Sequence, residues 1–212
     1  GTGVALEGVQ FKLQKQNGAD WTDITANDSN GSTYNLTTDI NGKITIAGLS
    51  QGEYRIFEDA YSNTSANKGY ILDAEYHTFT VQKNGQIQVD GNVSANATIQ
   101  VANHRPDMKK EVKKGDSWAQ DAPYGVGDTV PYKITIEVPQ NIDKLSTFTV
   151  TDTPTGLKDN VGSIKIKDGT TALTSGTDYT VAAEGTDGFK IDFILTSNTV
   201  KACAGHTVTI TY

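Results

Sequence analysis

The sequence predicts an all-β protein made of two tandem immunoglobulin-like antiparallel β-sandwiches. Three observations lead to this prediction: short runs in which apolar and polar residues alternate, turn dipeptides between those runs, and a length of 212 residues. Alternation with a period of two is the pattern of a strand that buries one face. Single domains typically span about 100–150 residues, so this length favours two domains.

Three runs in the first half of the chain alternate in this way and predict strands. Their inward-facing residues are Val9, Phe11 and Leu13, then Tyr54, Ile56 and Glu58, and finally Ile99, Val101 and Asn103. Short strands separated by polar turns are typical of a sandwich. The expected first core consists of Phe11, Leu13, Tyr54, Ile56, Ile99 and Val101.

The second half holds the longest alternating run. Its inward-facing residues are Val130, Tyr132, Ile134, Ile136 and Val138. Two other runs contribute one face each, formed by Met108, Lys110 and Val112 and by Phe148, Val150 and Asp152. The expected second core consists of Tyr132, Ile134, Ile136, Phe148, Val150, Val208 and Ile210.

Turn dipeptides separate these runs. They are Asn17-Gly18, Asn30-Gly31, Asn41-Gly42, Asn84-Gly85 and Asp168-Gly169. Such pairs favour the backbone conformations of tight hairpin turns. They support an antiparallel arrangement in both halves.

The boundary between the two domains is predicted at about residue 105. In His104-Arg105-Pro106-Asp107 a strand ends, and the proline disfavours its continuation before a new charged strand begins. The predicted domains are residues 1–105 and 106–212.

Composition excludes several classes of function. The net charge is -7 with two arginines, and Lys and Arg do not cluster among aromatic residues, which argues against a nucleic-acid partner. The sequence contains no run of 18 apolar residues, so it predicts no membrane span. His77, His104 and His206 are scattered and no hydrolase motif occurs, so we expect a protein that is not an enzyme and needs no cofactor.

Two further features have ordinary interpretations. Cys203 is the single cysteine, so no internal disulfide forms, and its surroundings predict a plain buried thiol. Asp23, Asp28 and Asp39 are interpreted as turn residues, with a surface calcium site as the alternative, and no metal site is predicted.

Four polar side chains stand on strand faces where the alternation calls for an aliphatic residue. They are Glu58, Asn103, Lys110 and Asp152. Each one alone is explained by a position at a wet strand end. Buried charges are costly unless they are paired or neutralised, so four together point to a shared chemical purpose.

The order of several short motifs resembles that of Gram-positive sortase-assembled pilins and adhesins. The first half resembles the Cna B-type (SpaA-like) domain through Leu6-Glu7-Gly8-Val9-Gln10-Phe11-Lys12-Leu13, Thr38-Asp39-Ile40-Asn41-Gly42-Lys43, Gly48-Leu49, Gly52-Glu53-Tyr54-Arg55-Ile56-Phe57-Glu58 and Gly69-Tyr70. The second half resembles a fimbrial isopeptide-forming domain through Lys110, Val126-Gly127-Asp128-Thr129-Val130, Tyr132, Val138-Pro139, Phe148-Thr149-Val150-Thr151-Asp152-Thr153 and Val208-Thr209-Ile210-Thr211-Tyr212.

This resemblance implies an autocatalytic amide cross-link in each domain. A lysine amine on the first strand attacks the carboxamide of an asparagine on the last strand, ammonia leaves, and a buried acid assists. Burial favours the neutral forms of a lysine and a carboxylic acid, which are the reacting forms. By position, Glu58 is the assisting acid and Asn103 the acceptor of the first domain, while Lys110 is the nucleophile and Asp152 the acid of the second.

The remaining partners are expected outside the chain. The family's first-domain lysine would precede Gly1, and the second-domain asparagine would follow Tyr212. Lys12 is a conceivable substitute for the lysine, but alternation turns it outward. A chain trimmed relative to its parent, or domains without their bonds, are both consistent with this pattern.

The resemblance also implies a role and a place. We expect a stalk or shaft segment of a pilus or adhesin that is extracellular and anchored to the cell wall, with neighbouring domains or pilin subunits as partners. The alternative is an adhesin module that binds glycan or host matrix, with Tyr61, Tyr70 and Tyr76 as its contact surface. A family loop over the sandwich edge is the simpler interpretation of that stretch.

Overall fold

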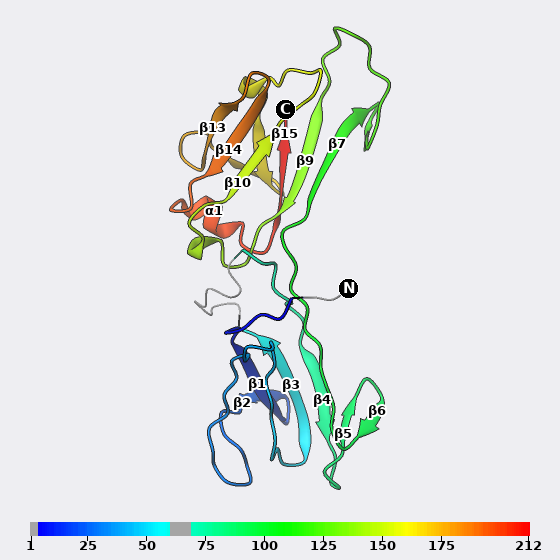
Figure 1. Ribbon diagram of the computed structural model, residues 1–212, viewed down its shortest axis with the longest axis vertical. Helices are drawn as coiled ribbons and strands as arrows, with labels where there is room; N and C mark the ends of the chain where they lie inside the picture. The colour runs from blue at the N-terminus through cyan, green and yellow to red at the C-terminus, as the bar shows by residue number, and fades with distance from the viewer. Residues whose placement is uncertain (1–3, 60–68) are drawn as a thin grey trace. The chain divides into compact units, whose positions relative to one another are not determined.

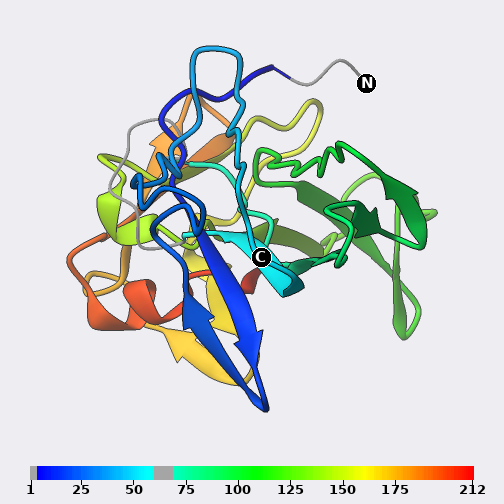
Figure 2. The same cartoon turned by 90° about the horizontal axis from the view of Figure 1, so that it is seen from below.

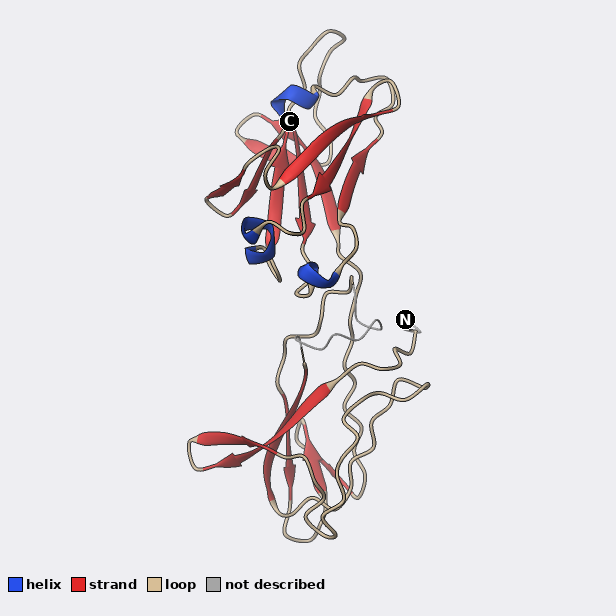
Figure 3. Cartoon of the chain, turned by 90° about the vertical axis from the view of Figure 1, so that its left-hand side faces the viewer, coloured by secondary structure: helices blue, strands red, loops and turns tan. Residues whose placement is uncertain are grey.

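The fold is all-β, as the sequence predicts. It is seen in a computed structural model, which describes residues 4–59 and 69–212. Within these residues the chain forms two compact units, one holding residues 4–59 and 72–104 and the other holding residues 69–71 and 105–212. Strands and loops make up nearly all of both units (Figure 3). No helix among the described residues is long and apolar enough to cross a membrane.

The first unit is built on a six-stranded antiparallel sheet of order β2-β1-β3-β4-β5-β6 (Figure 1). Its strands are β1 (Phe11–Asn17), β2 (Asp20–Asp23), β3 (Gly52–Glu58), β4 (His77–Val81), β5 (Ile87–Val89) and β6 (Asn92–Ser94). In the central pair, Phe11 of β1 lies opposite Glu58 of β3, and Lys15 lies opposite Tyr54. Because side chains alternate between faces, this register places Glu58 on the same inward face as Tyr54.

A tight hairpin joins β1 to β2, visible in blue in Figure 2. Asn17 pairs with Asp20, which leaves a two-residue loop of Gly18 and Ala19. Gly18 has a φ of 66°, a left-handed conformation that glycine adopts without steric cost. The Asn-Gly turn expected at this position is therefore present.

Loops cover the inward face of this sheet. Leu13, Tyr54 and Val81 are buried in the core, and the side chains packed against them from residues 24–49 are Ile24, Tyr34, Leu36, Ile46 and Leu49. These segments pair through isolated β-bridges, Gln10 to Thr37 and Ala26 to Thr33, and not as regular strands. The second layer of the first unit is thus held by side-chain packing together with scattered backbone hydrogen bonds, such as those from Phe11 N to Leu36 O and from Thr38 N to Val9 O.

One expected strand of the first unit is not formed as predicted. Residues 97–103 form no strand, and Ile99 and Val101 are half-buried rather than part of the core. Phe11 is also half-buried. Alternation of apolar and polar residues indicates that one face of a segment packs against apolar neighbours. It does not show that a partner strand pairs with that segment.

The second unit consists of two antiparallel sheets, with orders β10-β14-β13 and β12-β11-β15-β9-β7-β8. The strands are β7 (Met108–Lys114), β8 (Ser117–Ala119), β9 (Tyr132–Glu137), β10 (Thr149–Asp152), β11 (Lys165–Asp168), β12 (Thr171–Leu173), β13 (Tyr179–Glu184), β14 (Gly188–Phe193) and β15 (Thr207–Thr211). Three short helices complete it, η2 (Ile142–Lys144), η3 (Val161–Ser163) and α1 (Asn198–Ala202).

The two sheets enclose a single large core. Its buried residues from β9, β10, β14 and β15 are Ile134, Ile136, Val150, Phe189, Ile191, Phe193, Val208 and Ile210. The buried positions predicted on β9, β10 and β15 are confirmed, and Phe148 packs against the cluster while partly buried. Tyr132 is half-buried at the margin of this core. Burial of aliphatic and aromatic side chains at about 25 cal/mol per Å² is the main stabilising contribution to such a sandwich.

Candidate functional site

The candidate site of the second unit is centred on Lys110. This residue lies in the middle of β7, where it pairs with Ile134 of β9, and β9 in turn pairs with β15. Its Nζ donates a hydrogen bond of 2.6 Å to Oδ2 of Asp152, the last residue of β10. The carboxyl of Asp152 is 12% exposed and the Lys110 side chain 35% exposed. The two residues that the alternation placed on inward faces therefore meet across the two sheets.

Tyrosine rings flank the Lys110 ammonium. It lies 4.6 Å from the ring centroid of Tyr132 and 5.7 Å from that of Tyr212. These two rings stack on each other at 5.6 Å, and Phe189 meets Tyr212 edge-on at 4.8 Å. The aromatic faces attract the cation. Met108, expected on the same face of β7, is 49% exposed, so the apolar wall does not extend past Lys110 in that direction.

Tyr212 contributes a second donor to the same carboxylate oxygen. Its hydroxyl donates to Asp152 Oδ2 at 2.5 Å. Burial, and then the neighbouring Asp152 carboxylate, raise the pKa of Tyr212, so its hydroxyl keeps its proton and acts as a donor. Tyr212 is positioned by backbone hydrogen bonds in both directions with Tyr132. This contact was not predicted, because Tyr212 stood out in the sequence only as the end of a strand motif.

A glycine brings β14 unusually close to Asp152. A Cβ placed on Gly188 would lie 2.2 Å from the backbone oxygen of Asp152 and 3.0 Å from that of Glu184. Asp152 pairs with Phe189, the next residue along β14. Any side chain at position 188 would therefore force the end of β10, which carries Asp152, to shift.

A second carboxyl, Asp159, lies beside Asp152. Its Oδ2 is buried and has no hydrogen-bond partner in the described part of the chain. Burial, and then the charge of Asp152, raise the pKa of Asp159 to about 6. No pattern in the sequence singled out this residue, because it stands in the loop after β10, where alternation carries no information.

In the first unit, Glu58 and Asn103 also meet. Asn103 Nδ2 donates to Glu58 Oε1 at 3.1 Å, and the Glu58 side chain is almost fully buried, at 5% exposure. Asn103 Oδ1 accepts from the backbone nitrogen of Asp73 at 2.9 Å, and Asp73 also contacts His77 at 3.0 Å. Asn103 is thus oriented from both ends of its amide, with the nitrogen toward the acid.

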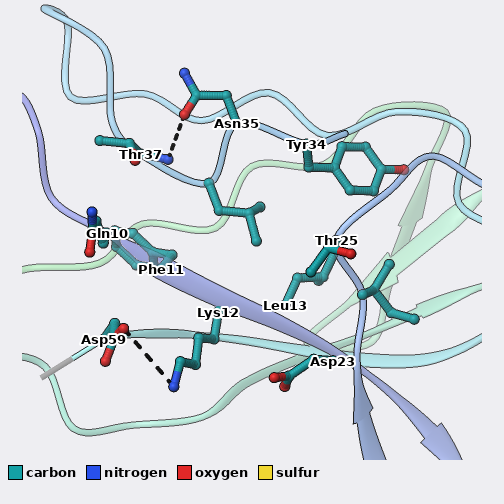
Figure 4. Close-up of a pocket in the computed structure, with 12 residues that line it drawn as sticks. Gln10, Phe11, Lys12, Leu13, Asp23, Thr25, Tyr34, Asn35, Thr37 and Asp59 are labelled. Carbon is teal, nitrogen blue, oxygen red and sulfur yellow. Dashed lines mark hydrogen bonds and ion pairs between the residues drawn. The ribbon is translucent and has the colours of Figure 1, made fainter. Parts of the chain in front are cut away.

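Lys12 does not join this pair. It lies opposite Phe57 and therefore points to the other face of the sheet from Glu58. Its ammonium is 4.0 Å from Asp59, and its side chain is 45% exposed. Figure 4 shows Lys12 and Asp59 at the side of a cavity of about 350 Å³ between β1 and the loops that cover it. The outward orientation predicted for Lys12 is confirmed.

Other residues considered in the sequence have structural surroundings. Cys203 is 2% exposed, as expected for a plain buried cysteine. Its burial is the largest cause that raises the pKa of the thiol, to about 11. Asp28 accepts a hydrogen bond from Ser50, and Asp39 accepts from Asn41 and Lys43 in a tight turn. Asp23 accepts from Gln14. Each of these aspartates thus has a donor of its own.

The tyrosines of the alternative contact surface are engaged by arginines. Arg55 lies 4.1 Å from the ring centroid of Tyr76 and 4.4 Å from that of Trp21. Arg105 lies 3.8 Å from the centroid of Tyr70. Tyr61 lies outside the described residues. The stack of Trp21, Arg55 and Tyr76 was not predicted, because its members come from three separate strands or strand ends.

Comparison with protein families finds a match to the N-terminal part of the chain. The sequence profile described as SpaA, a prealbumin-like fold domain, matches residues 1–94. These 94 of the 212 residues are similar to the SpaA prealbumin-like fold domain. Glu58 lies inside the matched segment, whereas Asn103 lies beyond it. No curated protein matches the sequence.

Solved pilin structures are similar to the chain as a whole. The major pilin subunit BcpA of Bacillus cereus is 22% identical, with 99% of this chain and 54% of BcpA covered and a TM-score of 0.43. The pilus protein RrgB of Streptococcus pneumoniae is 21% identical, with 98% of this chain and 38% of RrgB covered and a TM-score of 0.43. The major pilin SpaA of Corynebacterium diphtheriae is 16% identical, with 97% of this chain and 53% of that pilin covered and a TM-score of 0.40. The chain thus spans about half, or less, of the length of these pilins.

Proposed function

We propose that this chain is a structural segment of a bacterial surface pilus or adhesin stalk, in which each domain is closed by an autocatalytic bond between lysine and asparagine. The observation that carries the proposal is the contact between Lys110 Nζ and Asp152 Oδ2 at 2.6 Å, set among aromatic rings. The similarity of residues 1–94 to the SpaA domain supports the same role. The proposed location is the cell surface, with neighbouring pilin domains or subunits as partners.

The geometry of the second unit supports the following chemistry. Proton transfer from the Lys110 ammonium to Asp152 across their hydrogen bond leaves a neutral amine and a carboxylic acid. The amine forms a bond to the carbonyl carbon of an asparagine side chain that follows Tyr212, while the Asp152 acid donates a hydrogen bond to the amide oxygen as charge develops. Asp152 passes its proton to the amide nitrogen, and that nitrogen leaves as its bond to the carbon breaks. The Asp152 carboxylate then takes the second proton from the Lys110 nitrogen and is left protonated. The products are one amide cross-link and one ammonia.

Folding supplies the proximity for this step. Lys110, Asp152 and Tyr212 come from β7, β10 and the end of β15, and the two sheets hold them together before any bond forms. Well-oriented intramolecular reactions gain about 7–11 kcal/mol from such positioning. Each molecule reacts once, so the role is structural rather than enzymatic.

The first unit offers the complementary half of the same reaction. Asn103 presents its amide to the buried Glu58 acid, which fits an acceptor and its assisting group. Phe11 of β1 stands directly opposite Glu58, so a lysine that precedes β1 could approach from the open end of that strand. We propose that such a lysine is the nucleophile of the first domain.

A cross-link between first and last strands suits a protein that bears tension. Force that enters at β7 would leave through β15 by covalent bonds, and the sheets between them would not unfold. A link closing a loop of about 100 residues also stabilises the folded state, by roughly 4–5 kcal/mol if it acts like a disulfide of that span.

Intact mass measurement tests this function. A longer chain that continues past Tyr212 through an asparagine is expected to have a mass one ammonia below that of its sequence. Lys110→Ala should restore the full mass, and Lys109→Ala, one residue away on the opposite face of β7, should leave the loss in place. A mass equal to that expected from the sequence, measured on the folded longer chain, would contradict the proposal.

The alternative adhesin function has less support. The rings of Tyr70, Tyr76 and Trp21 each carry an arginine on one face, so these contacts are satisfied within the protein. Tyr76 is nevertheless 54% exposed. A glycan and collagen binding screen with the wild-type chain and the Tyr76→Ala variant separates the two functions, and we expect no binding that depends on Tyr76.

A further inference from the structure

The loop between β10 and η3 carries a buried carboxyl into the Lys110 site. This loop bears Asp159, whose backbone nitrogen donates to the backbone oxygen of Asp187 at 2.8 Å. That bond ties the loop to the turn between β13 and β14, next to the close approach of Gly188 and Asp152. Asp159 is therefore placed by the same packing that places Asp152.

Asp159 is poorly satisfied as an anion. Its Oδ2 is buried without a hydrogen-bond partner in the described residues, whereas Asp152 Oδ2 accepts from both Lys110 and Tyr212. A buried carboxylate oxygen without a donor is costly, and a protonated carboxyl avoids that cost. The site thus holds one carboxyl oxygen with two hydrogen-bond donors and one buried carboxyl oxygen with none among the described residues.

Three charged groups act on Asp159 from the surrounding elements, and a fourth titratable group is acted on by it. Asp152 of β10, Asp187 of the turn between β13 and β14, and Lys110 of β7 act through their charges, and the hydroxyl of Tyr212 after β15 is itself influenced by Asp159. Asp152 acts more strongly on Asp159 than Lys110 does. The balance of these groups favours a proton on Asp159 under mildly acidic conditions.

We propose that Asp159 is a positioning residue of the Lys110 site, which forms a carboxyl pair with Asp152 and controls through that pair where the proton of the site resides. This inference rests on the proposed function. When Asp159 is protonated, Asp152 stays ionised and keeps Lys110 as an ammonium. When Asp159 is ionised, two adjacent negative charges disfavour each other, so Asp152 takes the proton from Lys110 and the amine becomes nucleophilic.

The atoms balance without any external reactant. Ionisation of Asp159 releases one proton to water. A first Lys110 proton then moves to Asp152, and bond formation to the asparagine carbonyl follows. Asp152 passes that proton to the amide nitrogen, which leaves as ammonia, and then takes the second proton from the Lys110 nitrogen. Asp159 contacts neither the new bond nor the leaving group and acts only by its charge. The rate of cross-linking should therefore rise as the pH passes upward through the titration of Asp159.

The first test is the titration of Asp159 itself, in the chain of 212 residues. Carboxyl carbon NMR should find Asp159 with a midpoint near pH 6, as its surroundings indicate. The Asp152→Asn variant, which removes the neighbouring charge, should lower that midpoint, and Lys158→Ala, at the exposed preceding residue, should leave it unchanged. An Asp159 midpoint near 4 that does not respond to Asp152→Asn would overturn the carboxyl pair.

The second test measures cross-linking rates in the longer chain between pH 5 and 8. The wild type should show a step near pH 6, and Asp159→Asn should give a flat profile that is about tenfold slower at pH 7.5, the ratio that corresponds to one pKa unit of coupling. Loss of ammonia with the same pH profile in wild type and Asp159→Asn overturns the role of Asp159 and leaves the proposed function intact. If no ammonia is lost, the proposed function fails, and the NMR titration still decides whether the two acids share a proton.

Discussion

The hydroxyl of Tyr212 and the ammonium of Lys110 donate to one and the same oxygen, Oδ2 of Asp152. Tyr212 follows β15 and Lys110 lies on β7, with β9 between them in the sheet. A single carboxylate oxygen on the opposite sheet therefore joins the first and the last strands of the second unit. This arrangement makes the site sensitive to each of the three residues.

Removal of the Tyr212 hydroxyl should weaken the second unit while its packing is kept. Tyr212→Phe retains the contacts with Tyr132 and Phe189 but deletes a hydrogen bond to a carboxylate, so we expect a loss of about 1–2 kcal/mol in the free energy of unfolding. Urea unfolding followed through Trp118, in a Trp21→Phe background, reports on this unit. Tyr124→Phe, which removes an exposed bond to the Lys113 carbonyl, is the matched control and should cost less than about 0.5 kcal/mol.

Substitution of Gly188 should be among the most damaging small changes in the second unit. The added methyl group of Gly188→Ala meets the Asp152 backbone oxygen at 2.2 Å, so the strand must shift, at a cost of about 1–3 kcal/mol. Gly162→Ala meets only the Asn160 side chain at 3.4 Å and should be nearly neutral. Equal stability of the two variants in urea would show that β10 and β14 leave room for a side chain at position 188.

The contribution of Asp159 to the stability of the second unit should fall as the pH rises from about 4 to 6. The pKa of Asp159 is raised from 3.8 to about 6 in the folded chain, so over this interval the unfolded state has lost its proton while the folded state still holds it. Stability from this group is then constant above about pH 6. Because other carboxyls also titrate, the measured quantity is the difference in unfolding free energy between wild type and Asp159→Asn across this range. A difference that does not vary with pH would contradict the raised pKa.

Asn103 should matter to the first unit through two hydrogen bonds. Asn103→Ala removes the donor to the buried Glu58 and the acceptor of the Asp73 N–H, so the expected loss is about 1–3 kcal/mol. Amide hydrogen exchange at Asp73 should accelerate in this variant. Asn84→Ala, in an exposed turn, serves as the control. Unchanged exchange at Asp73 in Asn103→Ala would argue against an Asn103 amide oxygen that faces the Asp73 N–H.

Cys203 should be unreactive while the chain is folded. Only 2% of the residue is exposed, and burial raises the pKa of the thiol to about 11, so little thiolate exists at neutral pH. Iodoacetamide labelling followed by mass spectrometry should proceed only in denaturant. Rapid labelling in buffer would show that α1 and its surroundings open readily.

Much of the fold was predictable because strands with one buried face repeat every second residue. Ile134, Val150 and Ile210 follow that rule, and so do the polar exceptions Lys110 and Asp152, whose placement on inward faces was the signal of a site. The same reasoning placed Glu58 inside the first unit. These residues share a position in the middle or at the end of a regular strand.

The residues that escaped prediction have no such regularity. Asp159 stands in a loop, where its burial depends on how β13 and β14 turn beneath it. The role of Gly188 depends on the distance between two strands, which a sequence does not express. Residues 24–49 cover the first sheet without forming strands, and residues 97–103 alternate without one. Both depend on tertiary packing rather than on local pattern.

The most direct test of the proposed cross-link is tandem mass spectrometry of a protease digest of the longer chain, with asparagine present after Tyr212. We predict one branched species in which the side chain of Lys110 is joined to that asparagine, and its absence in Asp152→Ala protein that remains folded. Recovery of the Lys110 peptide in linear form from the folded wild-type chain, with its amine free to react, would contradict the cross-link and the role built on it.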